Sequence, residues 1–516
     1  MSDSEIEALA NNDLLLKLSK QFLKLGIFEN KLQCLNRLLC VANLCKSEFE
    51  SVYSEPKLEN SPQNRAKVKG RNSAPLVEYE LEINNSEIKH RLEKVMSDNG
   101  IRGRNVMRKC MIYAIEEILN VYPNSVYIGE DVSHGGYYLV TDGLSAKYPL
   151  RIRDFPPDET ALFGIGIGYV QSGLIPIVEM PYAKYLDCGA DMFFEAIIMN
   201  WLSNGQQSNG LMFRLQGFGN GLFGGNFHTH NCLYIPPGLD VVCYSNGYDY
   251  INGWRYAIQQ CIQGRCVMSV DCTAQLNNRH CFGETAKDGL LLTHVPHCNE
   301  YLTFDDVIIY GSDSNKNTKY ILYDSEQSCE GRMTEGSDET AYVNVNETKD
   351  LSQIFTKSSK KCKNGLNILI VSYGMGVNAS RQAQKELLDG SETGLNKNGE
   401  ICDIFVIDCP YLSDVPKQLR LLFENDLRNG KDRKEIDLVL FTDMCKEGQN
   451  PLNAMANKLQ NCNVLQKYEW LSIAAQYTYN PLGKDLTFLS KDDIVETALK
   501  LIRNYKESSP LIEYKY

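Results

Sequence analysis

Short apolar runs alternate with helix-like segments over most of this 516-residue chain, and this alternation limits the folds open to it. A chain that alternates strands and helices forms a parallel, doubly wound sheet with helices on both faces. The stretch 284–364, rich in Asp, Ser, Asn and Glu, interrupts the alternation, which then restarts. We therefore predict an α/β protein with two doubly wound domains. The predicted strands are Ser125–Ile128, Ile175–Glu179, Leu211–Leu215, Cys266–Val270, Leu366–Tyr373, Asp403–Asp408 and Leu438–Thr442, and the helices between them include Arg104–Val121, Asp191–Trp201, Tyr256–Gln263, Asn378–Leu388, Pro416–Asn425 and Pro451–Gln460.

The N-terminal region has a different pattern. Leu14, Leu18, Phe22 and Leu25 recur at helical spacing within residues 13–45, which we predict to be helical. A polar, Pro-containing stretch follows and is predicted to be a linker. The predicted organisation is a helical extension and linker (1–75), a first α/β domain (76–290), an irregular connector (291–364) and a second α/β domain (365–516).

Composition argues against several kinds of partner. The net charge of −12 argues against nucleic acid, which needs clustered Lys and Arg to neutralise its phosphates. No apolar run reaches membrane-spanning length, so no membrane partner is expected. The 18 cysteines are scattered without a CxxC pair, which indicates reduced, mostly buried thiols in an intracellular protein and no metal site. Residues 1–36 contain no Arg and include several acidic residues, unlike a mitochondrial leader.

One carboxylate occupies a conspicuous place. Glu159 follows a Pro-Pro turn and immediately precedes a predicted helix that begins T-A-L-F-G-I-G-I-G. An acidic residue at this position can simply favour the N-terminus of the helix. Glu130 stands in a second segment, G-E-D-V-S-H-G-G, shortly before it. The choice between a capping role and a chemical role depends on the segments around them.

Four segments, in order and spacing, resemble the beta chain of the thiamine-diphosphate-dependent component of 2-oxo acid dehydrogenases, of the branched-chain and pyruvate type. The first is G-E-D-V-S-H-G-G, and the second places Arg151, Pro156 and Glu159 in the family's R-V-x-x-T-P-x-x-E pattern. In the third segment, Glu179, Tyr182 and Tyr185 match the family's E-I-Q-F-x-D-Y pattern. In the fourth, Gly224, Gly225 and His228 match G-G-x-x-H-S-Q and precede Pro237, Gly238 and Leu239. In the second domain, Tyr373-Gly374, Asp408 and Asp443 match further residues of the family pattern. The resemblance implies a transketolase-like pyrimidine-binding domain and a transketolase C-terminal-like domain.

The resemblance also implies roles for these residues. Glu159 would activate thiamine diphosphate as a buried carboxyl group of raised pKa that donates a hydrogen bond to the aminopyrimidine ring. Tyr182 would stack on that ring, and Tyr185 and Glu130 would also contact the cofactor. His228 would assist acyl transfer, although the shortened segment after it leaves His230 as an alternative. Without the flanking matches, two tyrosines near a strand end would indicate ordinary packing. A lone histidine would likewise indicate a structural hydrogen bond.

Other parts of the family's site are absent or changed. Met212 and Gln263-Gly264 replace the residues that hold a monovalent cation, so this cation site is predicted to be altered or absent. The family binds diphosphate and magnesium through a G-D-G…N-N motif of the alpha chain. No such motif occurs here, since Asp389-Gly390 lacks the second half. We therefore expect an active site shared with an alpha chain, with magnesium on the alpha side.

The predicted function is that of a beta component which, with an alpha chain, decarboxylates a 2-oxo acid and passes the acyl group to a lipoyl arm of an acyltransferase core. The expected assembly is alpha-two beta-two, in the mitochondrial matrix or alternatively the cytoplasm, with branched-chain amino acid catabolism as the expected context. One alternative is a transketolase-like or deoxyxylulose-phosphate-synthase-like enzyme, although such enzymes carry the diphosphate domain in the same chain. Another is a non-catalytic structural or regulatory partner of such a complex. The N-terminal helices fit either the tail of an alpha region in a fused enzyme or an unrelated extension.

Overall fold

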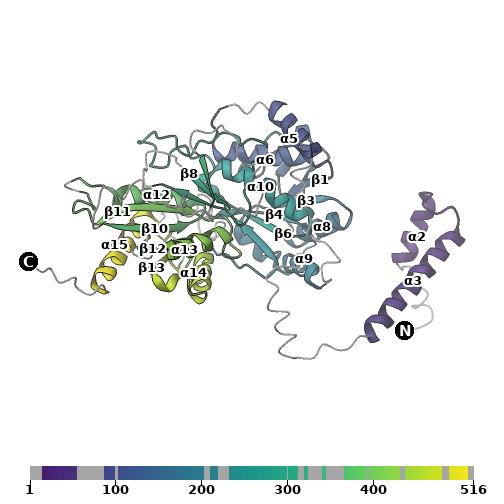
Figure 1. Cartoon of the computed structure of the whole chain (residues 1–516). Helices are drawn as coiled ribbons and strands as arrows, with labels where there is room; N and C mark the ends of the chain where they lie inside the picture. The colour runs from purple at the N-terminus through teal and green to yellow at the C-terminus, as the bar shows by residue number, and fades with distance from the viewer. Residues whose placement is uncertain are drawn as a thin grey trace, which may run out of the picture. The chain divides into compact units, whose positions relative to one another are not determined.

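A computed structural model of the chain (Figure 1) describes residues 14–54, 86–98, 103–202, 210–218, 232–298, 300–311, 319–323, 340–344, 365–391, 394–429, 436–478 and 487–508. The chain divides into two compact units, residues 1–71 and residues 72–516. Among the described helices, none is both long and apolar enough to cross a membrane.

The first unit contains a helical hairpin. Helix α2 (Leu14–Lys24) and helix α3 (Lys31–Ser54) are joined by a turn in which Gly26 adopts a positive φ of 72°. Cys34 of α3 is buried, and Phe22 and Phe28 pack edge to face inside the hairpin. The predicted N-terminal helices are therefore present, and α3 extends beyond the predicted end at residue 45. The predicted linker that follows lies outside the described residues.

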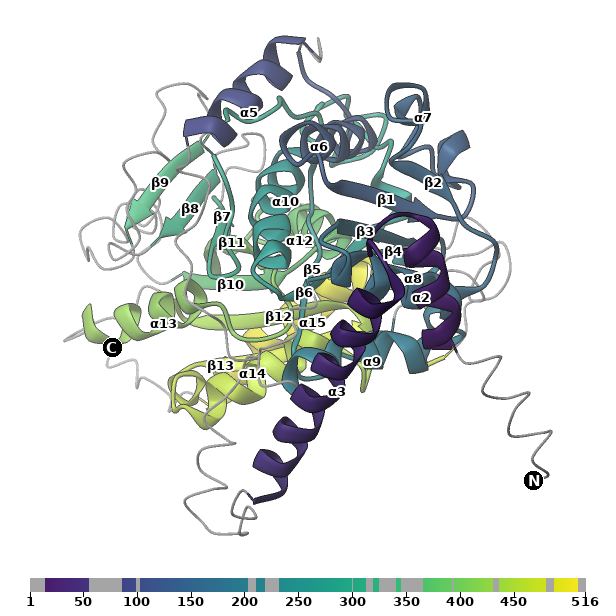
Figure 2. The ribbon, with the colours of Figure 1, turned by 90° about the vertical axis from the view of Figure 1, so that its right-hand side faces the viewer.

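The first sheet of the second unit is parallel throughout, as predicted. Its strand order is β2-β1-β3-β4-β6-β5. Helices α6 and α10 cover one face and helices α8 and α9 the other (Figures 1 and 2). Successive residues of β3 accordingly enter different cores, Ile177 beneath α6 and α10 and Val178 beneath α8 and α9. The elements are α6 (Met107–Val121), β1 (Ser125–Gly129), α7 (Leu144–Lys147), β2 (Ile152–Asp154), α8 (Glu159–Gln171), β3 (Ile175–Met180), α9 (Ala190–Leu202), β4 (Met212–Phe218), β5 (Leu239–Val242), α10 (Gly247–Ile262) and β6 (Cys266–Cys272).

The second sheet is mixed, with the order β13-β12-β10-β11-β7-β8-β9. Its central strands are parallel, and β7 pairs antiparallel with β11. Three of its strands lie in residues 291–364, so the prediction of an irregular connector there is wrong for these segments. Each of these strands has only four or five residues and is flanked by polar sequence. So short a segment shows no clear alternation of apolar and polar residues from which a strand can be predicted. The elements are β7 (Val307–Tyr310), β8 (Lys319–Tyr323), β9 (Thr340–Asn344), β10 (Leu366–Ser372), α12 (Met375–Leu387), β11 (Ile401–Asp408), α13 (Lys417–Asn429), β12 (Leu438–Lys446), α14 (Pro451–Asn461), β13 (Glu469–Ala475) and α15 (Lys491–Ser508).

The two sheets meet along the outer edge of β5. The Cys243 amide donates to the Pro410 carbonyl, and the Leu412 amide to the Val241 carbonyl, both at 2.8 Å. Val242 and Tyr411 thereby form an antiparallel bridge. The segment after β11 therefore caps the free edge of the first sheet.

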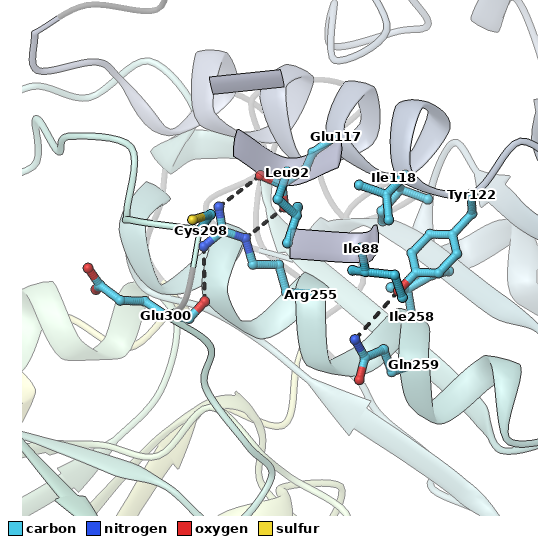
Figure 3. Close-up of a pocket in the computed structure, with 11 residues that line it drawn as sticks. Ile88, Leu92, Glu117, Ile118, Tyr122, Arg255, Ile258, Gln259, Cys298 and Glu300 are labelled. Atoms are coloured by element: carbon cyan, nitrogen blue, oxygen red, sulfur yellow. Dashed lines mark hydrogen bonds and ion pairs between the residues drawn. The ribbon is translucent and has the colours of Figure 1, made fainter. Parts of the chain in front are cut away.

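Helix α5 (Ser86–Asp98) packs against α6 at the upper edge of the first domain in the view of Figure 1. Figure 3 shows Leu92 beside a buried ion pair in which Arg255 donates to both Glu117 oxygens at 2.7 and 2.8 Å, and Ile88 beside Tyr122. Arg255 also donates to the His297 and Glu300 carbonyls. The cavity beneath α5 has a volume of about 20 Å³, room for one water rather than a ligand.

Candidate active site

The candidate site lies at the carboxyl edge of the first sheet. Glu130 directly follows β1, and Tyr182 follows β3 after one intervening residue. Because β1 and β3 are parallel neighbours, their ends bring these two side chains to the same edge. Tyr185 lies in the short 3-10 helix Ala183–Asp187, and Glu159 is the first residue of α8. The structure therefore brings together four of the five predicted site residues, whereas His228 lies outside the described residues.

Glu130 is the more buried of the two predicted carboxylates. Its side chain is only 7% exposed, and Oε1 has no hydrogen-bond partner among the described residues. The Tyr137 hydroxyl donates weakly to Oε2 at 3.4 Å. Burial raises the pKa of the Glu130 carboxyl, and the negative charge of Glu159 raises it further. Glu130 Oε1 is therefore a buried oxygen without a partner among the described residues, on a carboxyl group whose pKa is raised.

Glu159 is half-buried and does not cap its helix. The capping residue is Asp158, whose carboxylate accepts a hydrogen bond of 2.9 Å from the Ala161 amide. Asp158 therefore makes the capping hydrogen bond, while Glu159 lies in the first turn, where its charge still favours the helix N-terminus. Its side chain lies close enough to Glu130 for the two charges to interact.

A cluster of tyrosines surrounds the carboxylates. The Tyr182 ring is 4% exposed and packs against Tyr137 at 5.1 Å, Tyr185 at 5.3 Å and Tyr138 at 6.2 Å between ring centroids. Tyr137 is 45% exposed and contacts both Tyr182 and Glu130. A ring that stacks on Tyr182 therefore requires Tyr137 to shift. Sequence reasoning missed Tyr137 and Tyr138, although the Y-Y pair directly after the two glycines was a usable signal.

A buried ionic network forms the floor beneath the site. Arg214 of β4 is fully buried, and its Nε donates to Asp271 of β6 at 2.6 Å while Nη1 donates to Glu179 of β3. Tyr127 donates to Glu179, and Gln216 donates to its other oxygen at 2.7 Å. Burial alone disfavours the charge of Arg214, but the attraction of Asp271 outweighs it and holds the pKa well above the usual range.

The loop above this floor needs glycine. Gly136 has a φ of 66°, and a Cβ there would lie 3.1 Å from Glu179 Oε1. Both the backbone conformation and the close approach to the carboxylate therefore exclude a side chain at this position. Asp131 and Leu139, in the same loop, also have a positive φ, so the segment between β1 and α7 is tightly folded. This fold places Tyr137 over Glu130.

The donor set fits the organic part of a cofactor better than a metal. The described residues contain no group of three or more His, Cys, Asp or Glu side chains that could hold a metal ion. Glu130 offers a buried oxygen with no partner, and the tyrosines offer apolar ring surface. An aromatic heterocycle with one hydrogen-bonding nitrogen matches these features.

Comparison with known proteins agrees with this geometry. Residues 105–270 match the family described as "Transketolase, pyrimidine binding domain". The chain is 33% identical over 128 residues to the 2-oxoisovalerate dehydrogenase subunit beta of Bacillus subtilis (24% of this chain, 39% of the relative). It is 31% identical over 211 residues to the pyruvate dehydrogenase E1 component subunit beta of Gracilaria tenuistipitata (40% and 54%), and 28% identical over 156 residues to the acetoin:2,6-dichlorophenolindophenol oxidoreductase subunit beta of Cupriavidus necator (26% and 44%).

The chain spans 39% to 54% of the length of these three relatives. The matched region contains the strands and the carboxylates described above. Residues 105–270 thus match a transketolase-type pyrimidine-binding domain, and this part of the chain is similar to the beta subunits of 2-oxoisovalerate and pyruvate dehydrogenases.

Proposed function

We propose that this chain, with an alpha chain, decarboxylates a 2-oxo acid with thiamine diphosphate and transfers the acyl group to a lipoyl arm. The observation that carries the proposal is the buried, partnerless oxygen of Glu130, beside Glu159 and the tyrosine cluster. When bound, thiamine diphosphate supplies the electron sink for decarboxylation. The protein has to seat the aminopyrimidine ring and hold a proton next to one ring nitrogen.

The two carboxylates suit different parts of this task. A proton-donating carboxyl group must remain protonated near neutral pH, which requires burial and a raised pKa. Glu130 is buried and its pKa is raised above the ordinary value, whereas Glu159 is half-buried. We therefore assign the hydrogen bond to the ring nitrogen to Glu130, in place of Glu159. Glu159 would then support it, because its negative charge keeps the Glu130 proton in place.

The tyrosines would seat the ring. Tyr182 offers a ring that is already held from three sides, and Tyr185 packs against its edge. Tyr137 would move aside on binding and close over the ring afterwards, which would exclude water from the Glu130 proton. His228 keeps its proposed role in acyl transfer.

The proposed alpha partner would supply the diphosphate and magnesium sites. One exposed apolar face adjoins Glu159 and suits such a partner. On α8, Ile165 is 41% exposed, and a Cβ at Gly168 would meet open space. On α9, which packs against α8, Ile198 and Leu202 are exposed. A partner on this face would lie beside the carboxylates and complete an alpha-two beta-two assembly. The proposed compartment is the mitochondrial matrix or alternatively the cytoplasm, and the proposed substrates are the branched-chain 2-oxo acids.

One observation favours the alternative of a non-catalytic partner. Tyr137 covers both Glu130 and the Tyr182 ring, so the site is closed to a ring in the described conformation. A chain that only stabilises a catalytic assembly could keep this conformation permanently.

The test uses the chain co-expressed with a family alpha chain. Calorimetric titration with thiamine diphosphate and magnesium should show binding by the pair, and oxidation of 2-oxoisovalerate or pyruvate with an artificial electron acceptor should show turnover. Glu130→Gln should retain cofactor binding and lower kcat by at least about 100-fold, the usual range for a lost acid–base group. Asp131→Asn is the matched control, because Asn tolerates the positive φ of this neighbouring position.

Three outcomes separate the possibilities. A Glu130→Gln pair with normal kcat would refute the role assigned to Glu130, and a selective loss in Glu159→Gln would return that role to Glu159. A stable pair that binds no cofactor would refute the catalytic proposal and support the structural partner.

A further inference from the structure

A cavity lies where the first α/β domain meets helices α12 and α15. Its volume of about 300 Å³ is far larger than that of the cavity beneath α5 and reaches the size at which ligand pockets begin. Its walls come from the segment after β6, the start of α12, the end of β12 and the start of α15. None of its lining residues belongs to the carboxylate and tyrosine site described above.

The cavity lies at the point where the second sheet changes its direction of winding. Strand β10 leads through α12 to β11 on one side, whereas its other neighbour, β12, leads through α14 to β13 in the opposite direction. Met375 and Gly376 follow the carboxyl end of β10, Met444 lies near the end of β12, and all three line the cavity. Open α/β sheets bind ligands in the crevice at such a switch point. The position of the cavity therefore favours a ligand-binding role.

Two side chains of the lining offer protons to a ligand. The Gly289 amide donates to His280 Nδ1 at 2.8 Å, so the neutral imidazole carries its proton on Nε2. The Lys491 amine donates to Glu386 and Asp492, both at 2.6 Å, and has a third proton to donate. Since these two carboxylates offset the charge of Lys491, a net positive potential has to come from elsewhere.

Two helix N-termini supply that potential. Helix α12 begins at Met375 and helix α15 at Lys491, and both residues line the cavity. Each N-terminus carries about half a positive charge, which favours a bound anion. Asp493, in the first turn of α15, is engaged as a cap, since its carboxylate accepts hydrogen bonds from the Ser490 amide and hydroxyl. Among the described residues that line the cavity, none is acidic, so an anion meets donors and no lining carboxylate.

Other lining side chains suit the uncharged part of a ligand. Gln275 is 2% exposed, and its Oε1 has no hydrogen-bond partner among the described residues. Its Nε2 donates to the Ser245 carbonyl, which fixes the orientation of the amide and leaves the oxygen as an acceptor. Phe488 and Leu489 add apolar surface. A ligand with hydroxyl or amine groups can satisfy the Gln275 oxygen, which a bare anion cannot do.

We propose that this cavity binds a small phosphorylated molecule that also carries hydroxyl or amine groups. The phosphate would lie at the starts of α12 and α15, where His280 and Lys491 can donate to it. Three acceptor oxygens suit donors that come from several segments, which favours phosphate over carboxylate. The hydroxyl or amine groups would donate to Gln275. The site is separate from the proposed thiamine diphosphate site and consists of residues of this chain alone.

Calorimetric titration of the full chain, without an alpha chain or thiamine diphosphate, tests the site. AMP and ribose 5-phosphate should both bind, and adenosine, which lacks the phosphate, should bind at least about tenfold more weakly than AMP. Because the alpha chain and the cofactor are absent, the result does not depend on the proposed dehydrogenase activity. Failure of both phosphorylated probes to bind would overturn the proposal, as would equal affinities for AMP and adenosine.

Asn378→Asp tests whether the cavity is the place of binding. Asn378 lines the cavity near the start of α12, where an acidic residue is compatible with the helix but repels a phosphate, so the Kd for AMP should rise at least about tenfold. Asn450→Asp is the matched control, because it makes the same change at the N-cap of α14, outside the lining of the cavity. An unchanged Kd in Asn378→Asp, or an equal rise in both variants, would overturn the proposal.

A second variant blocks the cavity without adding a charge. Ala379→Leu adds volume to a residue that lines the cavity and should weaken the binding of AMP and ribose 5-phosphate alike. Thermal melting of each variant should give the wild-type Tm, which separates lost binding from lost folding. Normal binding of both probes by a folded Ala379→Leu chain would place them outside this cavity and refute the proposal.

Discussion

Replacing Arg214 with methionine would remove the only positive charge in the floor of the site. The guanidinium neutralises Asp271 and Glu179, and all three side chains are buried. Breaking a buried pair from one side typically costs about 3–5 kcal/mol, because it leaves an uncompensated charge. Burial already raises the pKa of Asp271 to about 6 despite Arg214. Without Arg214 this pKa rises further, so protonating Asp271 at pH 7 costs less than about 1.4 kcal/mol, and Glu179 keeps its bonds to Tyr127 and Gln216. The expected loss of unfolding free energy in Arg214→Met is therefore about 3–5 kcal/mol rather than twice that value.

The loss should depend on pH in a definite direction. Without Arg214 the folded-state pKa of Asp271 rises further above its unfolded value. A carboxyl group with a raised folded-state pKa destabilises the fold increasingly as the pH rises from its unfolded-state pKa to its folded-state pKa, and the lost stability returns as the pH falls through that window. The difference in unfolding free energy between wild type and Arg214→Met should therefore be largest at pH 7 and smaller at pH 5.

The assay can be confined to the domain that holds the network. The chain has three tryptophans, and Trp201→Phe with Trp470→Phe leaves Trp254 as the reporter. Trp254 stacks on Tyr250 and donates to Ser269 of β6, two residues from Asp271. Urea unfolding followed by its fluorescence gives the free energy at each pH. Arg265→Met is the matched control, because Arg265 is 18% exposed in its pair with Asp240 and should cost less. A loss for Arg214→Met no larger than that of Arg265→Met, or one that grows toward pH 5, would refute the reasoning.

Two further predictions concern packing in the same domain. Gly166→Ala should destabilise the domain by about 1–3 kcal/mol, because a Cβ would lie 2.9 Å from Val178 Cγ2. Gly168→Ala, on the open side of α8, should be neutral or stabilising by about 0.5–1 kcal/mol. Thermal melting of the two variants in parallel checks the sign of each change. Arg255→Leu should cost about 3–5 kcal/mol by leaving Glu117 buried without its partner, and Arg255→Leu/Glu117→Leu should recover most of that loss. A urea double-mutant cycle measures the second prediction, and an additive result would contradict it.

The sequence predicted most of the parallel strands of both sheets, because these strands are short apolar runs with helices between them. It placed the start of α10 too late, near Tyr256, whereas the helix begins at Gly247 after the cap Asn246, which accepts a hydrogen bond from the Asp249 amide. Gly253 is unusual inside a helix, but a Cβ there would lie 2.1 Å from the Tyr244 ring. A packing requirement between distant segments therefore overrides local propensity, and no periodicity reports it.

In the candidate site, too, the sequence predicted which residues take part but not how they pack. The resemblance to the beta chains brought Glu130, Glu159, Tyr182 and Tyr185 into consideration, and the structure places them at one edge of the sheet. Their relative burial could not be predicted, because it depends on how the loop between β1 and α7 folds back. That loop puts Tyr137 over Glu130, and Asp158 relieves Glu159 of capping. The Arg214 network was also missed, since its members come from β3, β4 and β6, which pair only in the folded sheet.

The bridge between Val242 and Tyr411 has a consequence during synthesis. Strand β5 leaves the ribosome long before the segment that covers its edge, and at about 5–20 residues per second the delay is roughly ten to thirty seconds. For that time the nascent first domain carries an open strand edge, which can pair with strands of other chains. Cys243 and Val241 gain their partners only when residues 410–412 arrive. The first domain therefore completes its sheet edge only after β10 and β11 of the second domain have been synthesised. A chain truncated before residue 410 is expected to aggregate through this open strand edge.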